Sequence, residues 1–83
     1  MDSDSLLFYL EVIKEVIEAG TVPSMDNIEK HIGHRAKRHE LVEAVGLLLE
    51  DGRIQKRITL VGWDADWQPR EVEYYHPSPR KGA

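Results

Sequence analysis

The segment Pro23–Ile58, with the sequence PSMDNIEKHIGHRAKRHELVEAVGLLLEDGRIQKRI, holds the pattern that decides the fold. Ser24 is a good N-cap, and Gly33 is the residue type that most often ends a helix. Between them lies an apolar stripe with helical spacing, formed by Met25, Ile28 and Ile32. A second, longer helix is predicted to begin within residues 34–38 and to run to about Asp51. The apolar residues that share one face of this helix are Leu41, Val42, Ala44, Val45, Leu48 and Leu49. The segment therefore predicts a short helix, a turn and a longer helix.

An amphipathic helix is predicted before this segment, over Ser5–Ala19, with Gly20 as its stop. Its apolar residues at helical spacing are Leu6, Tyr9, Leu10, Ile13, Val16 and Ile17. Phe8 and Val12 widen the apolar arc to about half of the helix circumference, more than the ~100° that one core face requires. The excess indicates that a second element covers this helix, either the domain's own C-terminal strands or a partner copy in a homodimer.

The residues that follow the longer helix predict a β-hairpin. Polar and apolar residues alternate over 53–61, which is typical of a half-buried strand. The apolar face of this strand carries Ile54, Ile58 and Leu60. Turn residues fill 62–70, and alternation resumes over 71–75. Two alternating runs around a turn predict an antiparallel pair.

The length of 83 residues predicts one domain, which we expect to span residues 1–76. The remaining residues, 77–83, are polar and contain two prolines, and we expect them to form a disordered tail.

The predicted order, three helices and then a two-stranded hairpin, resembles that of winged helix-turn-helix domains. In that family a short helix ending in glycine precedes a long helix that closes on an acid, a glycine and the first strand. The positions that match this pattern are Leu41, Val45, Leu48, Leu49, Gly52 and Ile54. The resemblance covers about Ser5–His76 and implies a mainly α fold with a small β-hairpin, the wing. Winged helices serve both as DNA readers and as protein-docking modules, so the resemblance leaves the role open.

The positive charges of this acidic chain are concentrated at one place. The net charge is −4, yet residues 30–39 contain four Lys and Arg side chains and no acid, against 7 bases and 15 acids in the other 73 residues. The resemblance implies that the turn and the start of the third helix contact duplex DNA through His34, Arg35, Lys37, Arg38 and His39. Lys30, Arg53 and Arg57 would extend the positive surface. This pattern predicts a small transcriptional regulator, which would bind as a homodimer because one domain with few bases binds DNA weakly.

A second hypothesis is a module that docks on another protein, either as a subunit of a larger complex or as a phage-type inhibitor. The predicted wing carries Trp63 and Trp67 beside two acids, Asp64 and Asp66, where a DNA-binding wing carries bases. We expect at least one of the two tryptophans to fold back over the hairpin and the first helix. The candidate residues for a protein interface are Trp63, Trp67, Phe8, Val12 and Leu47.

Other classes of function have little support in the sequence. The chain has no Cys, and His31, His34 and His39 straddle a helix break, so we expect no metal site. There is no glycine-rich phosphate loop and no nucleophile with a nearby base, so we expect neither a cofactor nor an enzymatic activity. The acidic start MDSDS does not resemble an export signal, and no apolar run is long enough for a membrane span. We therefore expect a cytoplasmic protein.

Overall fold

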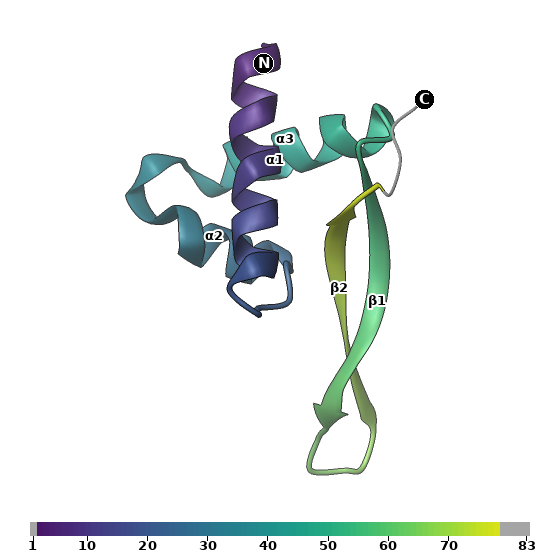
Figure 1. Ribbon diagram of the computed structural model, residues 1–83. Coiled ribbons are helices and arrows are strands. Elements are labelled where there is room, and N and C mark those ends of the chain that lie inside the picture. Colours follow the sequence, from purple (N-terminus) through teal and green to yellow (C-terminus); the bar gives the residue numbers. More distant parts are fainter. Residues whose placement is uncertain (1, 79–83) are drawn as a thin grey trace.

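Three helices precede a two-stranded antiparallel hairpin, in the predicted order. The computed structural model describes residues 2–78. Its elements are α1 (Ser3–Glu18), α2 (Met25–Ile32), the short 3₁₀ turn η1 (Gly33–Arg35), α3 (Arg38–Glu50), β1 (Ile54–Trp63) and β2 (Pro69–Pro77). Figure 1 shows the three helices grouped together, with the hairpin extending away from them. This layout is compatible with a winged helix.

Side-chain caps explain where the first two helices begin. Asp2 accepts a hydrogen bond from the backbone N–H of Ser5 over 2.9 Å, so α1 begins two residues before the predicted start. This hydrogen bond lowers the pKa of the Asp2 carboxyl. The predicted cap Ser24 accepts from the backbone N–H of Asn27 over 3.3 Å, and α2 ends as predicted before Gly33, whose φ is +65°.

The start of the longer helix, which the sequence left open, lies at Arg38. Residues 33–35 form the single 3₁₀ turn η1, and Ala36 then adopts an extended conformation. The backbone N–H of Lys37 donates to Glu40 Oε1 over 3.1 Å, which satisfies a donor just before the first turn of α3. The basic stretch therefore spans the end of α2, the connection and the first turn of α3.

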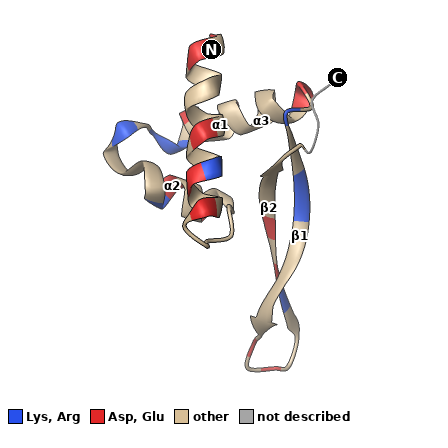
Figure 2. Ribbon diagram, viewed as in Figure 1, with Lys and Arg blue, Asp and Glu red and all other residues tan. Residues whose placement is uncertain are grey.

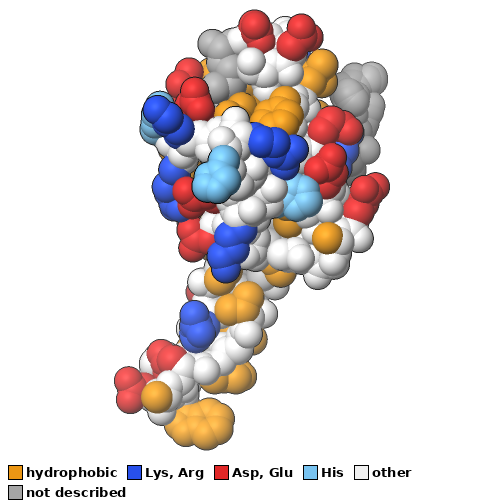
Figure 3. All heavy atoms as spheres, turned by 90° about the vertical axis from the view of Figure 1, so that its left-hand side faces the viewer, with side chains coloured by type: hydrophobic (Ala, Val, Ile, Leu, Met, Phe, Trp, Pro, Cys, Tyr) orange, Lys and Arg blue, Asp and Glu red, His pale blue; other side chains and the backbone are white. Residues whose placement is uncertain are grey.

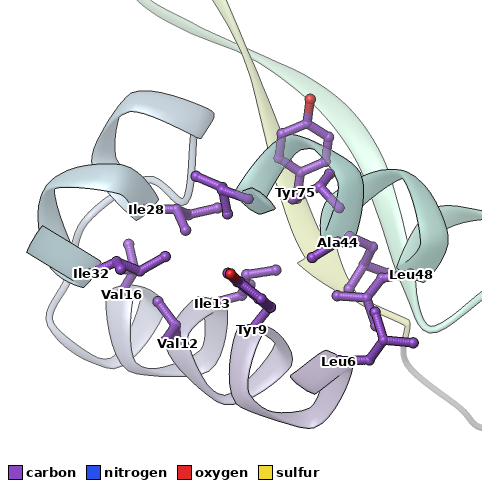
Figure 4. Close-up of a cluster of buried hydrophobic side chains, with 13 residues drawn as sticks. Leu6, Tyr9, Val12, Ile13, Val16, Ile28, Ile32, Ala44, Leu48 and Tyr75 are labelled. Carbon is purple, nitrogen blue, oxygen red and sulfur yellow. The ribbon is translucent and has the colours of Figure 1, made fainter. Parts of the chain in front are cut away.

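The core lies between the three helices and the base of the hairpin (Figure 4). Its most deeply buried members are Ile13, Ile28, Leu41, Leu48, Ile54, Val12 and Val16. Helix α1 contacts α2, α3 and β2, so elements of the same chain cover most of its wide apolar arc, while Phe8 stays 36% exposed. The interface prediction for Val12 is consequently wrong, because this side chain is buried in the core cluster with Val16 and Ile32.

Only the base of the hairpin is packed against the helices. Ile54 and Tyr75 are buried, whereas Ile58 is 61% exposed and Leu60 is 53% exposed. The prediction of a half-buried strand is therefore wrong for the outer part of β1. The alternation is present, but the hairpin extends beyond the helices, so its outer half has no second layer to pack on (Figure 1).

The last described residues belong to the folded domain. Pro77 pairs with Ile54 in the sheet, so it is not part of a tail. Ser78 donates from its backbone N–H to the carbonyl of Arg53 over 2.8 Å and from its hydroxyl to the carbonyl of Gly52 over 2.6 Å. The rest of the predicted tail, 79–83, lies outside the described residues.

Candidate nucleic-acid interface

The basic stretch forms one exposed surface, which we call the basic turn and define as residues 30–39. It includes the C-terminal end of α2, η1 and the start of α3. Figure 2 shows its blue segments on the side of the molecule away from the hairpin, and Figure 3 shows Lys, Arg and His side chains on that face. The structure exposes all five residues predicted to contact DNA, which are His34, Arg35, Lys37, Arg38 and His39.

Arg35 is occupied by contacts within the chain. Its Nε donates to the carbonyl of Ile32 over 3.0 Å, and its Nη2 donates to the carbonyl of His31 over 3.0 Å. The guanidinium also lies 5.7 Å from the centroid of the Phe8 ring, within the range of a cation–π contact. Arg35 thus caps the C-terminal end of α2, where the helix dipole favours a cation. Part of the charge run is therefore favourable for local stability.

Arg38 is also paired within the chain. Its Nη1 lies 2.6 Å from Glu29 Oε1 and 3.1 Å from Asp26 Oδ1, so one guanidinium joins the start of α3 to two acids of α2. The hydrogen bonds to Asp26 and Glu29 raise the pKa of Arg38. Because these two acids oppose its charge, Arg38 adds less positive potential to the surface than the sequence suggests.

Four members of the basic turn have no such partner. Among the described residues, no acid forms an ion pair with Lys30, His34, Lys37 or His39. All four are exposed. His31, by contrast, lies with Nε2 2.9 Å from Glu15 Oε1 of α1 and so joins α2 to α1. The surface available to a polyanion is therefore made by two lysines and two histidines.

The two predicted hairpin cations lie apart from the basic turn. Arg53 Nε is 3.8 Å from Asp51 Oδ2, and Arg57 donates to the Gln55 side chain over 2.9 Å. In Figure 2 the basic turn and β1 lie on opposite sides of α1. The structure thus does not bring Arg57 beside the basic turn to form one continuous patch.

Both tryptophans are exposed, so the expectation that at least one folds back is wrong. Trp63 is 57% exposed and Trp67 is 80% exposed. The pairing register has one irregularity, between Leu60 and Gly62, and it returns Trp63 to the hairpin face of Ile58 and Leu60. The outer hairpin therefore has a row of exposed apolar side chains, visible in orange in Figure 3.

The tip of the hairpin is a well-bonded turn. Asp64 Oδ1 accepts from the backbone N–H groups of Asp66 and Gln68, each over 2.9 Å. Trp67 donates its backbone N–H to the Asp64 carbonyl over 3.0 Å and has a φ of +60°, a conformation that usually belongs to glycine. The exposure of Trp67 is thus fixed by the turn and not by a loose loop.

The remaining interface candidates do not join the tryptophans. Phe8 lies on α1 under Arg35, on the side of the basic turn. Leu47 is partly buried and packs against the core. The five candidate residues for a protein interface therefore divide among the core, α1 and the hairpin.

The residues that the structure describes offer no cluster of three or more side chains suited to hold a metal ion. Within the same range, none of the helices has the length and apolar character needed to cross a membrane. A comparison with protein-family models finds no match, and a search of curated proteins finds none either.

Proposed function

We propose that the protein binds duplex DNA through the basic turn and acts as a transcriptional regulator. The observation that carries the proposal is the exposure, around the N-terminus of α3, of four Lys and His side chains without acidic partners. In helix-turn-helix proteins the N-terminal part of the motif's second helix, which corresponds to α3 here, contacts base edges, and the residues beside it contact phosphates. The N-terminus of a helix also attracts phosphate by its dipole and free N–H groups.

The contacts within the basic turn suggest separate roles for its cations. Lys37, directly before α3, and Lys30, at the end of α2, would bind phosphates as point charges. His34 and His39 would donate hydrogen bonds to phosphates or base edges. Arg38 would position the two helices, because Glu29 already holds its guanidinium.

Acids limit the size of this contact. From Glu40 onward the exposed positions of α3 include Glu43 and Glu50, which would repel the DNA backbone. The interface would thus be confined to one helical turn, so a single chain would bind weakly. Two chains on two half-sites would be required for specific binding.

The experiment is a fluorescence-anisotropy titration of a labelled mixed-sequence duplex at several salt concentrations between about 50 and 200 mM. We expect the logarithm of the binding constant to fall linearly with the logarithm of the salt concentration. Lys37→Ala should weaken binding and reduce the salt slope by about one unit, because one phosphate contact is lost. Lys14→Ala is the matched control, since it removes the same charge from the exposed face of α1. Absence of binding, or equal slopes for the two variants, would overturn the proposal.

The hairpin supports a second candidate function, docking on a protein. Five large apolar side chains lie exposed on it, and its tip carries two acids that disfavour DNA. We propose that Trp63 and Trp67 are the anchor residues of this surface. The test is a capture experiment with extract of the source cells, comparing the wild type, the double variant Trp63→Ala, Trp67→Ala and the control Lys14→Ala. Capture of the same partner by all three proteins would exclude this function for the hairpin.

A further inference from the structure

The outer hairpin and the basic turn are opposite in charge. We call residues 58–73, the part of the hairpin beyond its packed base, the arm. The arm contains four acids, Asp64, Asp66, Glu71 and Glu73, and one base, Arg70, so its net charge is −3. The basic turn contains four Lys and Arg side chains and no acid, and two of these cations, Lys30 and Lys37, form no ion pair among the described residues. Two such surfaces attract each other, most strongly at low salt.

The arm is also the most apolar exposed part of the described chain. Its exposed large hydrophobic side chains are Ile58, Leu60, Val61, Trp63 and Trp67. The largest apolar patch on a typical monomer covers about 300–600 Å², and larger patches usually mark an interface. Five such side chains on one hairpin, two of them tryptophans, are enough to form the centre of a protein–protein contact.

Apolar side chains border the basic turn as well. Val42 is exposed and lies one turn after Arg38, on the same face of α3. Phe8 is partly exposed beneath the Arg35 guanidinium. The basic turn thus offers an apolar border next to its cations, which matches the mixture of apolar and acidic side chains on the arm.

The arm and the basic turn of one chain are not in contact. They lie on opposite sides of α1 (Figure 2), and both tryptophans of the arm are exposed. A complementary surface for the arm is therefore available only from another molecule.

We propose that the arm of one copy packs on the basic turn of a second copy, and that the second arm reciprocates. This inference names a partner for the hairpin docking proposed above. Because the arm of each copy would cover the basic turn of the other, this dimer and DNA binding by the basic turn exclude each other, and neither proposal rests on the other. Packing of arm against arm is less favourable, because it would bring together the rows of Glu71 and Glu73, which share the apolar face. The arm-on-turn contact instead pairs acids with bases.

The first experiment uses the intrinsic fluorescence of the wild-type protein. Both tryptophans of the chain lie on the arm, so tryptophan emission reports the burial of the arm alone. With rising protein concentration at low salt, we expect a blue shift of the emission together with a doubling of the mass measured by light scattering. An emission maximum and a mass that stay unchanged up to the highest concentration would overturn the proposal.

The second experiment exchanges the charges of the two surfaces. The arm variant is Asp66→Lys, Glu71→Lys, and the turn variant is Lys37→Glu, His39→Glu. None of these side chains forms a described ion pair, and circular dichroism would check that each variant is folded. We expect each variant to remain monomeric alone and a mixture of the two to form a heterodimer, because each surface then meets its opposite again.

The outcomes distinguish the arm-on-turn contact from association through a different surface of the protein. A dimer formed by the arm variant alone, with wild-type affinity, would show that such a surface mediates association and would overturn the proposal. Failure of the mixture to restore a dimer would do the same. DNA binding is measured separately, at concentrations where the wild type is monomeric, so either proposal can fail without the other.

Discussion

Arg38, the first residue of α3, lies 2.6 Å from the carboxylate of Glu29 in α2. The same Nη1 atom lies 3.1 Å from Asp26, one turn earlier on α2. A residue that the sequence presents as a free cation is therefore a connection between two helices. This arrangement fixes the approach of α2 to α3 and so the position of the basic turn.

The contact between Arg38 and Glu29 predicts that Arg38 contributes to the stability of the fold as well as to the charge of the basic turn. Arg38→Gln should cause a small loss of stability in urea unfolding, and Glu29→Gln should cause a similar loss. The double variant should lose less than the sum of the two, because the pair is already broken in either single variant. The loss should shrink with added salt, since the three side chains are between 39% and 78% exposed. Equal stability of Arg38→Gln and wild type at low salt would contradict this role.

Two isoleucines of the same strand predict opposite effects of one substitution. Ile54 is buried at the base of the hairpin, whereas Ile58 lies on the exposed arm. Ile54→Ala should lower the free energy of unfolding by about 2 to 5 kcal/mol. Ile58→Ala should change it by no more than about 0.5 kcal/mol. Urea unfolding followed by circular dichroism measures both, and similar losses for the two variants would mean that the arm packs on the helices.

The turn at the tip predicts a stabilising substitution. Trp67 has a φ of +60°, which costs a residue with a Cβ atom about 1 kcal/mol or more. Trp67→Gly removes this strain, while the greater freedom of glycine in the unfolded chain offsets part of the gain. We expect a net increase in stability of up to about 1 kcal/mol for Trp67→Gly. Trp67→Ala keeps the Cβ atom and should show no increase in stability. An equal increase for Trp67→Gly and Trp67→Ala in urea unfolding would contradict backbone strain at this position.

Tyr9 predicts a loss of stability in alkaline solution. Its burial in the core, together with the nearby Glu40 and Glu43, raises the pKa of its phenol above the usual 10.0. The folded chain then holds this proton more tightly than the unfolded chain. The protonated Tyr9 phenol therefore contributes to the free energy of unfolding. This contribution is complete below pH 10.0 and is lost as the pH rises from there to the raised pKa. Urea unfolding of wild type and Tyr9→Phe across this range should show the steeper decline in the wild type, and parallel curves would contradict the shift.

Much of the fold could be predicted because its signals are local. The cap Ser24 and the stop Gly33 define α2 within eight residues, and the structure has both in those roles. The start of α3 could not be predicted from the apolar spacing. The 3₁₀ turn η1 carries no apolar residue, so the spacing does not show where this turn ends and the helix begins. Helix boundaries of this kind depend on caps such as that of Lys37 and Glu40.

The hairpin shows what alternation leaves undetermined. A period of two defines which residues share a face, and the register confirms that Ile58 and Leu60 do so. Burial of that face needs a second layer, and whether one exists depends on how far the helices extend beside the strand. The sequence of the strand alone therefore does not determine whether its apolar face is buried.

The candidate site was predictable in place but not in detail. The acid-free composition located the basic turn, and its Lys, Arg and His side chains are exposed. The partners of the two arginines could not be inferred, because backbone carbonyls hold Arg35 and the acids that hold Arg38 lie on the preceding helix. From the sequence alone, Arg35 and Arg38 are expected to contact DNA, whereas the fold uses both side chains internally.

The most direct test of the central proposal is the amide NMR spectrum of the protein during titration with a short mixed-sequence duplex. It is recorded at low salt and at a concentration where the protein is monomeric. DNA binding by the basic turn predicts that the largest shift changes fall on residues 33–39, with little change at the hairpin tip, 63–67. Changes centred on the tip, or no changes at all, would contradict DNA binding by the basic turn.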